Sequence, residues 1–360
     1  MGIGVGCASS GHSAAEKARR SSMLTWRHLL AIVCCIVSIG ADAQALVAAR
    51  LVVIFNLDDV QSKRVALYYA GQRGIPAANV IGIHLPLVDV LAPETFRPIR
   101  IRLIDALPSE IQSLVLVWSK PYAVGCMSVT SAFAAGYRDD FCKPGCGRTR
   151  LNPLYNAEGW LPADTVGWWP AMLLPSDDWG LADALIRRGI ESDSTAPPGT
   201  LYLVHTGDLA RNVRADTYRN VILTLGHRMQ SVELWDPEPS GHTIPETIGY
   251  FTGSANVEEL SQIRFRPGAL ADHLTSTGGK LAGGNQMSAV AWLRQGATAS
   301  YGSVSEPCNH LEKFPDIAVL FNHYLHGETA LEAYWKSVAM AGQGLFIGEP
   351  LSRPYPLQHH

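Results

Sequence analysis

The sequence has no strong excess of charge of either sign. Its 360 residues include 29 Lys and Arg against 32 Asp and Glu, so the formal net charge is -3 at pH 7. This balance excludes the broad basic surface that nucleic-acid backbones require, and we expect no nucleic-acid partner. Charged residues make up only 17% of the chain and hydrophobic residues 47%, which is typical of a folded globular protein.

Several familiar catalytic and cofactor motifs are missing. No H-E-x-x-H zinc motif occurs, and Ser276 lacks the G-x-S-x-G context of a lipase-type nucleophile. The glycines at 2–6 follow no strand pattern, and residues 276–280 (STGGK) lack the spacing of a phosphate-binding loop. The sequence therefore predicts neither a cofactor nor a bound metal.

The chain also has no apolar run long enough to span a bilayer comfortably. The run at 29–40 is short, follows Arg27, and leads into Ala-Asp-Ala at 41–43. A charged start, a short apolar centre and a small-x-small end are the signature of a cleaved signal peptide. We expect residues 1–43 to be an N-terminal extension and signal peptide, with Met1 or Met23 as the start. The mature chain is then exported, periplasmic or extracellular, without a membrane span.

Removal of residues 1–43 would leave an even number of cysteines. The four are Cys126, Cys142, Cys146 and Cys308. In an oxidising compartment such a set indicates disulfides, with three possible pairings. Cys142 and Cys146 could bridge around their Pro-Gly turn, and a zinc site is the alternative.

Alternating strand and helix patterns predict an α/β fold. Continuous apolar runs indicate buried strands, and runs with helical period lie between them. The pattern holds in two stretches, 50–119 and 171–355, separated by an insertion at 120–170 that is rich in Cys and Trp. We predict one domain over 44–360, with a doubly wound, mostly parallel sheet flanked by helices.

Polar residues follow several of the expected strands. They lie at 205–208, 252–254, 272–276 and 302–309. Ligands of open α/β sheets bind beyond the carboxyl ends of the strands, so this convergence predicts a site.

Within that region, His273 is a candidate general base, because its ordinary pKa lies near neutrality. The adjacent Asp272 would point to the opposite face of a regular strand, whereas Thr275 shares the face of His273. Ser276, Thr275 or Cys308 would be the nucleophile. The alternatives are a buried structural histidine and a disulfide-bonded cysteine.

Further polar residues could orient or bind a ligand. Glu306 and Asp208 could position catalytic partners, and Thr252 and Ser254 are candidate binding residues. Close to Asp208, the side chains of Arg211 and Arg214 could clamp a carboxylate or another anion. The alternative for that group is a helix cap at Asp208 with solvated or structurally paired arginines.

Long motifs carry a resemblance to known proteins. The runs at 267–279 (PGALADHLTSTGG), 286–309 and 327–355 resemble a family of exported bacterial proteins without an assigned activity, over about residues 50–355. The order of elements, with RGIP at 73–76 and GLFIGEP at 344–350, is also similar to gingipain-type cysteine peptidases. That similarity implies a caspase-like α/β fold.

The same resemblance implies a missing catalytic dyad. Gingipain-type peptidases carry His-Gly at one strand end and Cys at the next, but here Thr252-Gly253 and the cysteine-free segment 272–276 occupy those places. The chain is therefore expected to act in binding or envelope-associated processes, with a peptide, glycan or envelope component as partner. The alternative is a non-classical hydrolase or peptidase that uses His273.

Overall fold

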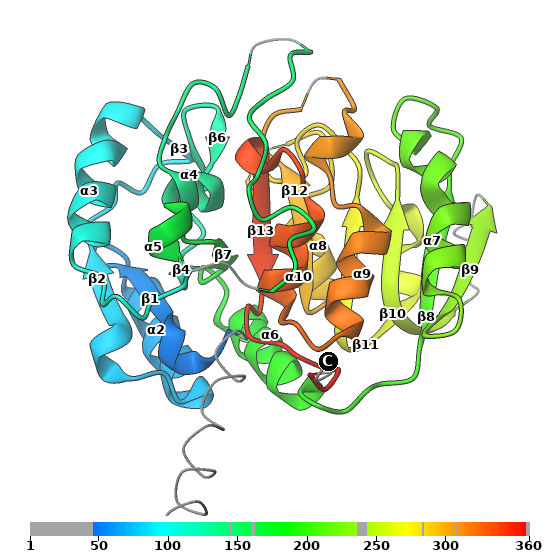
Figure 1. Ribbon diagram of the computed structural model, residues 1–360, viewed down its shortest axis with the longest axis horizontal. Helices are drawn as coiled ribbons and strands as arrows, with labels where there is room; N and C mark the ends of the chain where they lie inside the picture. Colours follow the sequence, from blue (N-terminus) through cyan, green and yellow to red (C-terminus); the bar gives the residue numbers. More distant parts are fainter. Residues whose placement is uncertain are drawn as a thin grey trace, which may run out of the picture. The chain divides into compact units, whose positions relative to one another are not determined.

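The computed structural model describes residues 46–143, 146–159, 163–235, 243–282, 284–306 and 308–357, so the predicted signal peptide lies outside the described residues. In this part of the chain, one sheet of ten strands is flanked by helices (Figure 1). The strand order is β2-β1-β4-β7-β13-β12-β11-β10-β8-β9. The strands are β1 (Leu51–Asn56), β2 (Val80–Ile83), β4 (Ser113–Val117), β7 (Ala171–Leu174), β8 (Thr200–His205), β9 (Gln230–Trp235), β10 (Ile244–Thr252), β11 (Ile263–His273), β12 (Ala299–Ser303) and β13 (Gly344–Gly348).

The predicted α/β fold with a mostly parallel sheet is confirmed, but the sheet has two halves of opposite direction. Strands β2, β1, β4 and β7 are mutually parallel, and β13 runs parallel to β7. Strand β13 is antiparallel to β12, which begins the second parallel set β12-β11-β10-β8-β9. We call these the first and second half-sheets. The strands of the first half-sheet therefore have their carboxyl ends on one side of the sheet, and the strands of the second half-sheet have theirs on the opposite side.

The helices begin with residues that suit helix N-termini. The side chains of Asp59, Asp178 and Asp316 cap α2, α6 and α9, and Thr329 with Glu332 forms a capping box at the start of α10. Figure 1 shows α9 and α10 in front of the second half-sheet and α8 behind it. The helices are α2 (Val60–Arg73), α3 (Pro93–Asp105), α4 (Val129–Ala135), α5 (Ala163–Val166), α6 (Trp179–Ser192), α7 (Tyr218–Leu225), α8 (Ala289–Gln295), α9 (Ile317–Leu325) and α10 (Ala330–Ser337). None of the described helices is long and apolar enough to cross a membrane.

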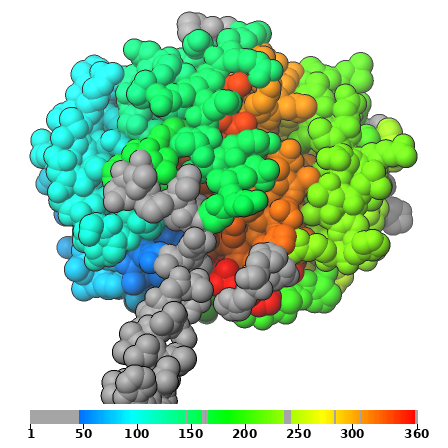
Figure 2. All heavy atoms as spheres, in the orientation of Figure 1, coloured from blue at the N-terminus to red at the C-terminus, as the bar shows by residue number. Residues whose placement is uncertain are grey.

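The predicted insertion contains short elements of its own. Strands β5 (Ala123–Val124) and β6 (Met127–Ser128) form a small sheet with β3 (Val90–Leu91). Helix α4, buried from Val129 to Ala134, packs on β7 and β13, and its small residues allow close approach to the sheet. Figure 2 shows the insertion spread over this face of the molecule, beside the segment after β12.

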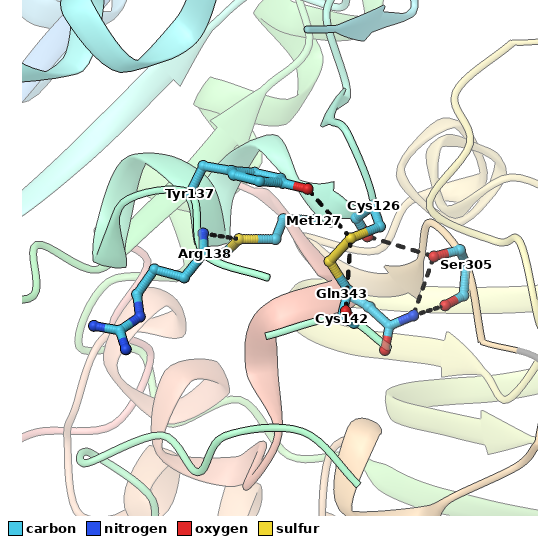
Figure 3. Close-up of a disulfide and its surroundings, with 7 residues drawn as sticks. All are labelled: Cys126, Met127, Tyr137, Arg138, Cys142, Ser305 and Gln343. Atoms are coloured by element: carbon cyan, nitrogen blue, oxygen red, sulfur yellow. Dashed lines mark hydrogen bonds between the residues drawn. A yellow bond between two sulfur atoms is a disulfide. The ribbon is translucent and has the colours of Figure 1, made fainter. Parts of the chain in front are cut away.

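Two disulfides hold the insertion, and neither is the local bridge. Cys126 pairs with Cys142, and Cys146 pairs with Cys308 across 162 positions of sequence. The prediction of disulfides is supported, but the suggested Cys142–Cys146 bridge is wrong. Figure 3 shows the first disulfide beside the Tyr137 hydroxyl. The second joins the insertion to the segment after β12, which helps to close the surface above the second half-sheet.

Candidate functional site

Four strands of the second half-sheet end at the same edge. Neighbouring residues in the parallel registers include Thr252 with His273, and Asp272 with Tyr301. Strands β8, β10, β11 and β12 therefore bring their polar carboxyl ends together, as the sequence predicts. We call this edge the carboxyl edge.

His273 lies at this edge but is enclosed and fully hydrogen-bonded. Its side chain is buried, Nε2 lies 2.9 Å from the carbonyl oxygen of Met287, and Nδ1 accepts a 2.9 Å hydrogen bond from the indole of Trp292. Burial lowers the pKa of His273 to about 4, so the ring is neutral at pH 7. The backbone of Gly278 closes over the ring, because a Cβ there would lie 3.3 Å from Cε1.

The Thr275 hydroxyl has partners other than His273, and the contact of Ser276 is made by its backbone. The Thr275 hydroxyl accepts a 3.0 Å hydrogen bond from Nε of Arg211 and donates one of 2.9 Å to Oε1 of Gln286. Ser276 accepts the backbone N–H of Glu306 through its carbonyl oxygen at 2.9 Å. The two ring nitrogens of His273 are already engaged, so neither hydroxyl has a base in contact with it.

Glu306 and Cys308 serve the architecture of the segment after β12. The Glu306 carboxylate forms a buried ion pair with Lys313, with 2.5 Å between Oε2 and Nζ. Its other oxygen accepts the backbone N–H of Cys308 at 2.7 Å. The Cys308 sulfur is bonded to Cys146 and is not a free thiol. Glu306 thus orients a disulfide-bonded segment and not a nucleophile.

Asp272 and Arg214 form a second buried ion pair at the carboxyl edge. Arg214 Nη2 donates to Asp272 Oδ1 at 2.5 Å and to the carbonyl oxygen of Thr252 at 3.0 Å. Their side chains are 3% and 0% exposed. Burial raises the pKa of Asp272, although Arg214 opposes the rise. Asp272 contacts Arg214 and His273 contacts Trp292, so the adjacent side chains have separate partners, as strand alternation predicts.

The predicted arginine clamp is divided between two environments. Arg211 is partly exposed and donates to Asp208 at 2.7 Å, while Asp208 also caps the following turn. Arg214 is buried and points to Asp272 instead. Ser254 donates to the carbonyl oxygen of Asn256. Arg211 and Arg214 therefore do not form one joint clamp.

His205, at the end of β8, belongs to an aromatic cluster. Its Nε2 lies 2.7 Å from Oε2 of Glu233, and its ring stacks on Trp235 with the centroids 3.7 Å apart. The polar end of β8 is evident in the sequence, whereas its partners Glu233 and Trp235 come from the neighbouring strand β9.

A cavity of about 150 Å³ lies beside the carboxyl edge. Its residues come from the segment after β8, the insertion, the segment after β12, and the end of α10. They are Tyr155, Arg214, Thr217, Leu311, Glu312, Phe314, Pro315, Asp316, Ser337 and Ala339. Within the described residues, Nε and Nη1 of Arg214 are buried without a hydrogen-bond partner. Arg214 therefore contributes to the cavity wall as one half of its buried pair with Asp272.

Sequence reasoning missed most of this cavity. The sequence predicted a binding role for Arg214. Phe314, Asp316 and Ala339 lie in segments whose patterns indicate only where helices begin or end. A signal was present in the Pro-Asp pair at 315–316, which marks the start of α9. Among the described residues, no group of three or more His, Cys, Asp or Glu is placed to hold a metal ion.

Comparison with known proteins adds no family to this geometry. No protein-family model matches the chain, and no curated protein is significantly similar to it. The resemblance to gingipain-type peptidases stays a prediction from sequence motifs.

Proposed function

We propose that this protein is an exported ligand-binding protein on a gingipain-like scaffold, and that it does not hydrolyse peptides with a His/Cys dyad. One observation carries the proposal: His273, the candidate base, has both ring nitrogens engaged inside the protein. Because the enclosed His273 is a poor base, we assign the carboxyl edge a binding role in envelope-associated processes.

Catalysis by His273 would need a free lone pair and access to a nucleophile. The lone pair on Nδ1 accepts the Trp292 indole N–H, and Nε2 faces the Met287 carbonyl oxygen, so Nε2 carries the proton. A pKa of about 4 makes the ring a weak base at neutral pH. Cys308 cannot attack a carbonyl group while its sulfur is part of a disulfide.

Binding is supported by the cavity beside the edge. Concave sites with an apolar lining and a few polar groups are the usual form of small-ligand sites. Here Phe314, Leu311 and Ala339 supply apolar wall, and Arg214, Glu312 and Asp316 supply polar groups. Of the predicted partner classes, a small ligand or one residue of a peptide suits this volume. The two disulfides favour an oxidising, exported environment.

The decisive experiment is labelling of the purified, unreduced mature protein with broad serine-, threonine- and cysteine-directed activity probes. We expect no labelling of the native protein, because both ring nitrogens of His273 are engaged and the Cys308 sulfur is part of a disulfide. His273→Gln serves as the comparison, since it removes the only proposed base. Labelling of the native protein that disappears in this variant would establish the hydrolase alternative and overturn the binding proposal.

A further inference from the structure

The segment after β12 forms a short strap over the carboxyl edge, which we define as residues 308–311. On either side of the strap, Glu306 and Lys313 are fixed by the buried ion pair between them. Within the strap, the Asn309 side chain donates to the carbonyl oxygen of Ala210, in the loop that follows β8. Because β11 and β10 lie between β12 and β8 in the sheet, the strap crosses the ends of both strands.

The strap is tied to the insertion mainly by one covalent bond. The disulfide between Cys308 and Cys146 makes this link, and Nε2 of His310 lies 2.8 Å from the carbonyl oxygen of Cys146. Directly after the strap, Glu312 pairs with Arg148 at 2.7 Å. Both noncovalent contacts are exposed to solvent, where such contacts contribute little to stability. The disulfide is therefore the strong link between the strap and the insertion.

The two disulfides differ in their access to solvent. Cys146 is exposed and Cys308 is half-buried. In the other disulfide, Cys142 is only 3% exposed, and the half-buried Cys126 packs against the core with its sulfur 3.6 Å from the hydroxyl of Tyr137 (Figure 3). A thiolate must reach a sulfur atom before it can reduce a disulfide, and exposed disulfides are accordingly the labile ones. Access therefore favours reaction at the disulfide that holds the strap.

We propose that the disulfide between Cys146 and Cys308 is a thiol–disulfide exchange site, at which a dithiol reductant releases the strap from the insertion. The reductant is the reduced cysteine pair of a thiol–disulfide oxidoreductase. One of its thiolates attacks the sulfur of Cys146, the S–S bond breaks, and Cys308 leaves as a thiolate that takes a proton from water. The second thiol of the reductant attacks the mixed disulfide and frees Cys146. The reductant becomes a disulfide, and its two electrons and two protons end on the two cysteines of this chain.

Release of the strap changes one wall of the cavity beside the carboxyl edge. Leu311, the last residue of the strap, lines that cavity. The next residue, Glu312, accepts the backbone N–H of Met340 at 2.6 Å, and Phe314 follows the buried Lys313. Movement is therefore confined to the strap, and it displaces Leu311 while the rest of the wall stays in place. Exchange at the disulfide thus controls how open the cavity is, which goes beyond the proposed binding function.

Reduction of the mature protein with dithiothreitol under native conditions tests the exchange site. Samples are quenched with N-ethylmaleimide at successive times, and peptide mass spectrometry gives the labelled fraction of each cysteine. We expect Cys146 and Cys308 to be labelled together, at least about tenfold faster than Cys126 and Cys142. A variant with alanine at both Cys126 and Cys142 keeps only the exposed disulfide, which should be reduced within about twofold of its rate in the native protein.

Hydrogen exchange of the protein trapped after this first reduction measures release of the strap. The backbone N–H groups of Lys313 and Phe314 donate to carbonyl oxygens of the strap at 3.0 and 2.9 Å. With Cys146 and Cys308 reduced and alkylated, we expect both amides to exchange at least about tenfold faster than in the oxidised protein. The amide of Leu274, which donates to a carbonyl oxygen of β10 at 2.9 Å, is the internal control and should be unchanged.

Arg148→Gln is the matched control for the strap, because it removes the neighbouring ion pair with Glu312 and keeps the disulfide. We expect this variant to leave the exchange of Lys313 and Phe314 within about twofold of the native value. Equal rates of reduction at the two disulfides would overturn the proposal, and so would unchanged exchange after reduction or an equal acceleration in Arg148→Gln. The binding function fails through a different result, namely His273-dependent labelling of the unreduced protein.

Discussion

The buried imidazole of His273 makes the stability of the protein depend on pH in a predictable direction. Burial lowers the folded-state pKa of His273 from 6.5 to about 4. Between these two values the unfolded chain binds a proton that the folded chain does not, so stability rises with pH. The contribution of His273 is fully present above the unfolded-state pKa and is lost as the pH falls towards the folded-state pKa.

The size of the effect follows from the pKa difference. A shift of about 2.5 units at 1.36 kcal/mol per unit corresponds to a maximum of about 3.4 kcal/mol in the free energy of unfolding. Between pH 7.5 and pH 5.0, the two proton-binding curves give a loss of about 2 kcal/mol from this one side chain. His273→Gln removes the titration and keeps an amide N–H for the Met287 carbonyl oxygen.

Urea unfolding at pH 7.5 and pH 5.0, with disulfides intact, measures this quantity. The native protein and His273→Gln share their other titrating groups, so the difference between their pH dependences comes from His273. Between pH 7.5 and pH 5.0, we expect the free energy of unfolding to fall by about 2 kcal/mol less in the variant than in the native protein. His84→Gln is the matched control, because the side chain of His84 is 75% exposed. We expect the change in unfolding free energy of this control between the two pH values to lie within about 0.5 kcal/mol of that of the native protein.

A variant His273→Gln that retains the full pH dependence of the native protein would refute the reasoning. The ring would then titrate alike in the folded and unfolded chains, which means that it is not desolvated and that its Nδ1 lone pair is accessible. That result would also remove the main support for the binding proposal, since an accessible neutral imidazole is what a general base requires.

Two further predictions concern the framework of the site. Alanine at both Cys146 and Cys308, separated by 162 positions, should cost about 5 kcal/mol of unfolding free energy on chain-entropy grounds, and alanine at Cys126 and Cys142, separated by 16, about 3 kcal/mol. Denaturant titration of the double variants checks this, and equal costs would contradict it. Gly253→Ala should destabilise by about 1–3 kcal/mol, because its Cβ would lie 2.0 Å from a backbone oxygen, and a native-like melting temperature would speak against that close approach.

Apolar periodicity predicted the strands of the sheet better than their directions. Strands β1 and β4 are continuous apolar runs rich in β-branched residues, which is the pattern of strands that are buried on both faces. The reversal at β13 leaves no trace in such a run, since a buried strand has the same pattern in either direction. The four-residue β7 and the two-residue strands of the small sheet are too short for a periodic signal.

The position of the candidate site was predictable, whereas its partners were not. Polar residues after β10 and β11 marked the carboxyl edge, because the ends of parallel neighbours must meet. The pairing of Asp272 with Arg214 joins residues 58 positions apart, and the bond from Trp292 to His273 requires the placement of α8 behind the sheet. Local patterns contain neither relation. Disulfide pairing has the same dependence on tertiary structure, which is why the local Cys142–Cys146 bridge was a reasonable but wrong expectation.

The burial that makes these side chains poor catalysts makes them a rigid frame for binding. Arg214 is held by Asp272, and the next buried ion pair, Lys313 with Glu306, holds the segment that also contributes Phe314 to the cavity. Removing one partner of a buried pair costs about 3–5 kcal/mol, so the cavity walls are expected to resist rearrangement in the empty protein. A preformed cavity loses little conformational entropy when a ligand binds, which favours recognition of a small molecule. Catalysis at this edge would instead require an accessible base, and the frame encloses its only candidate.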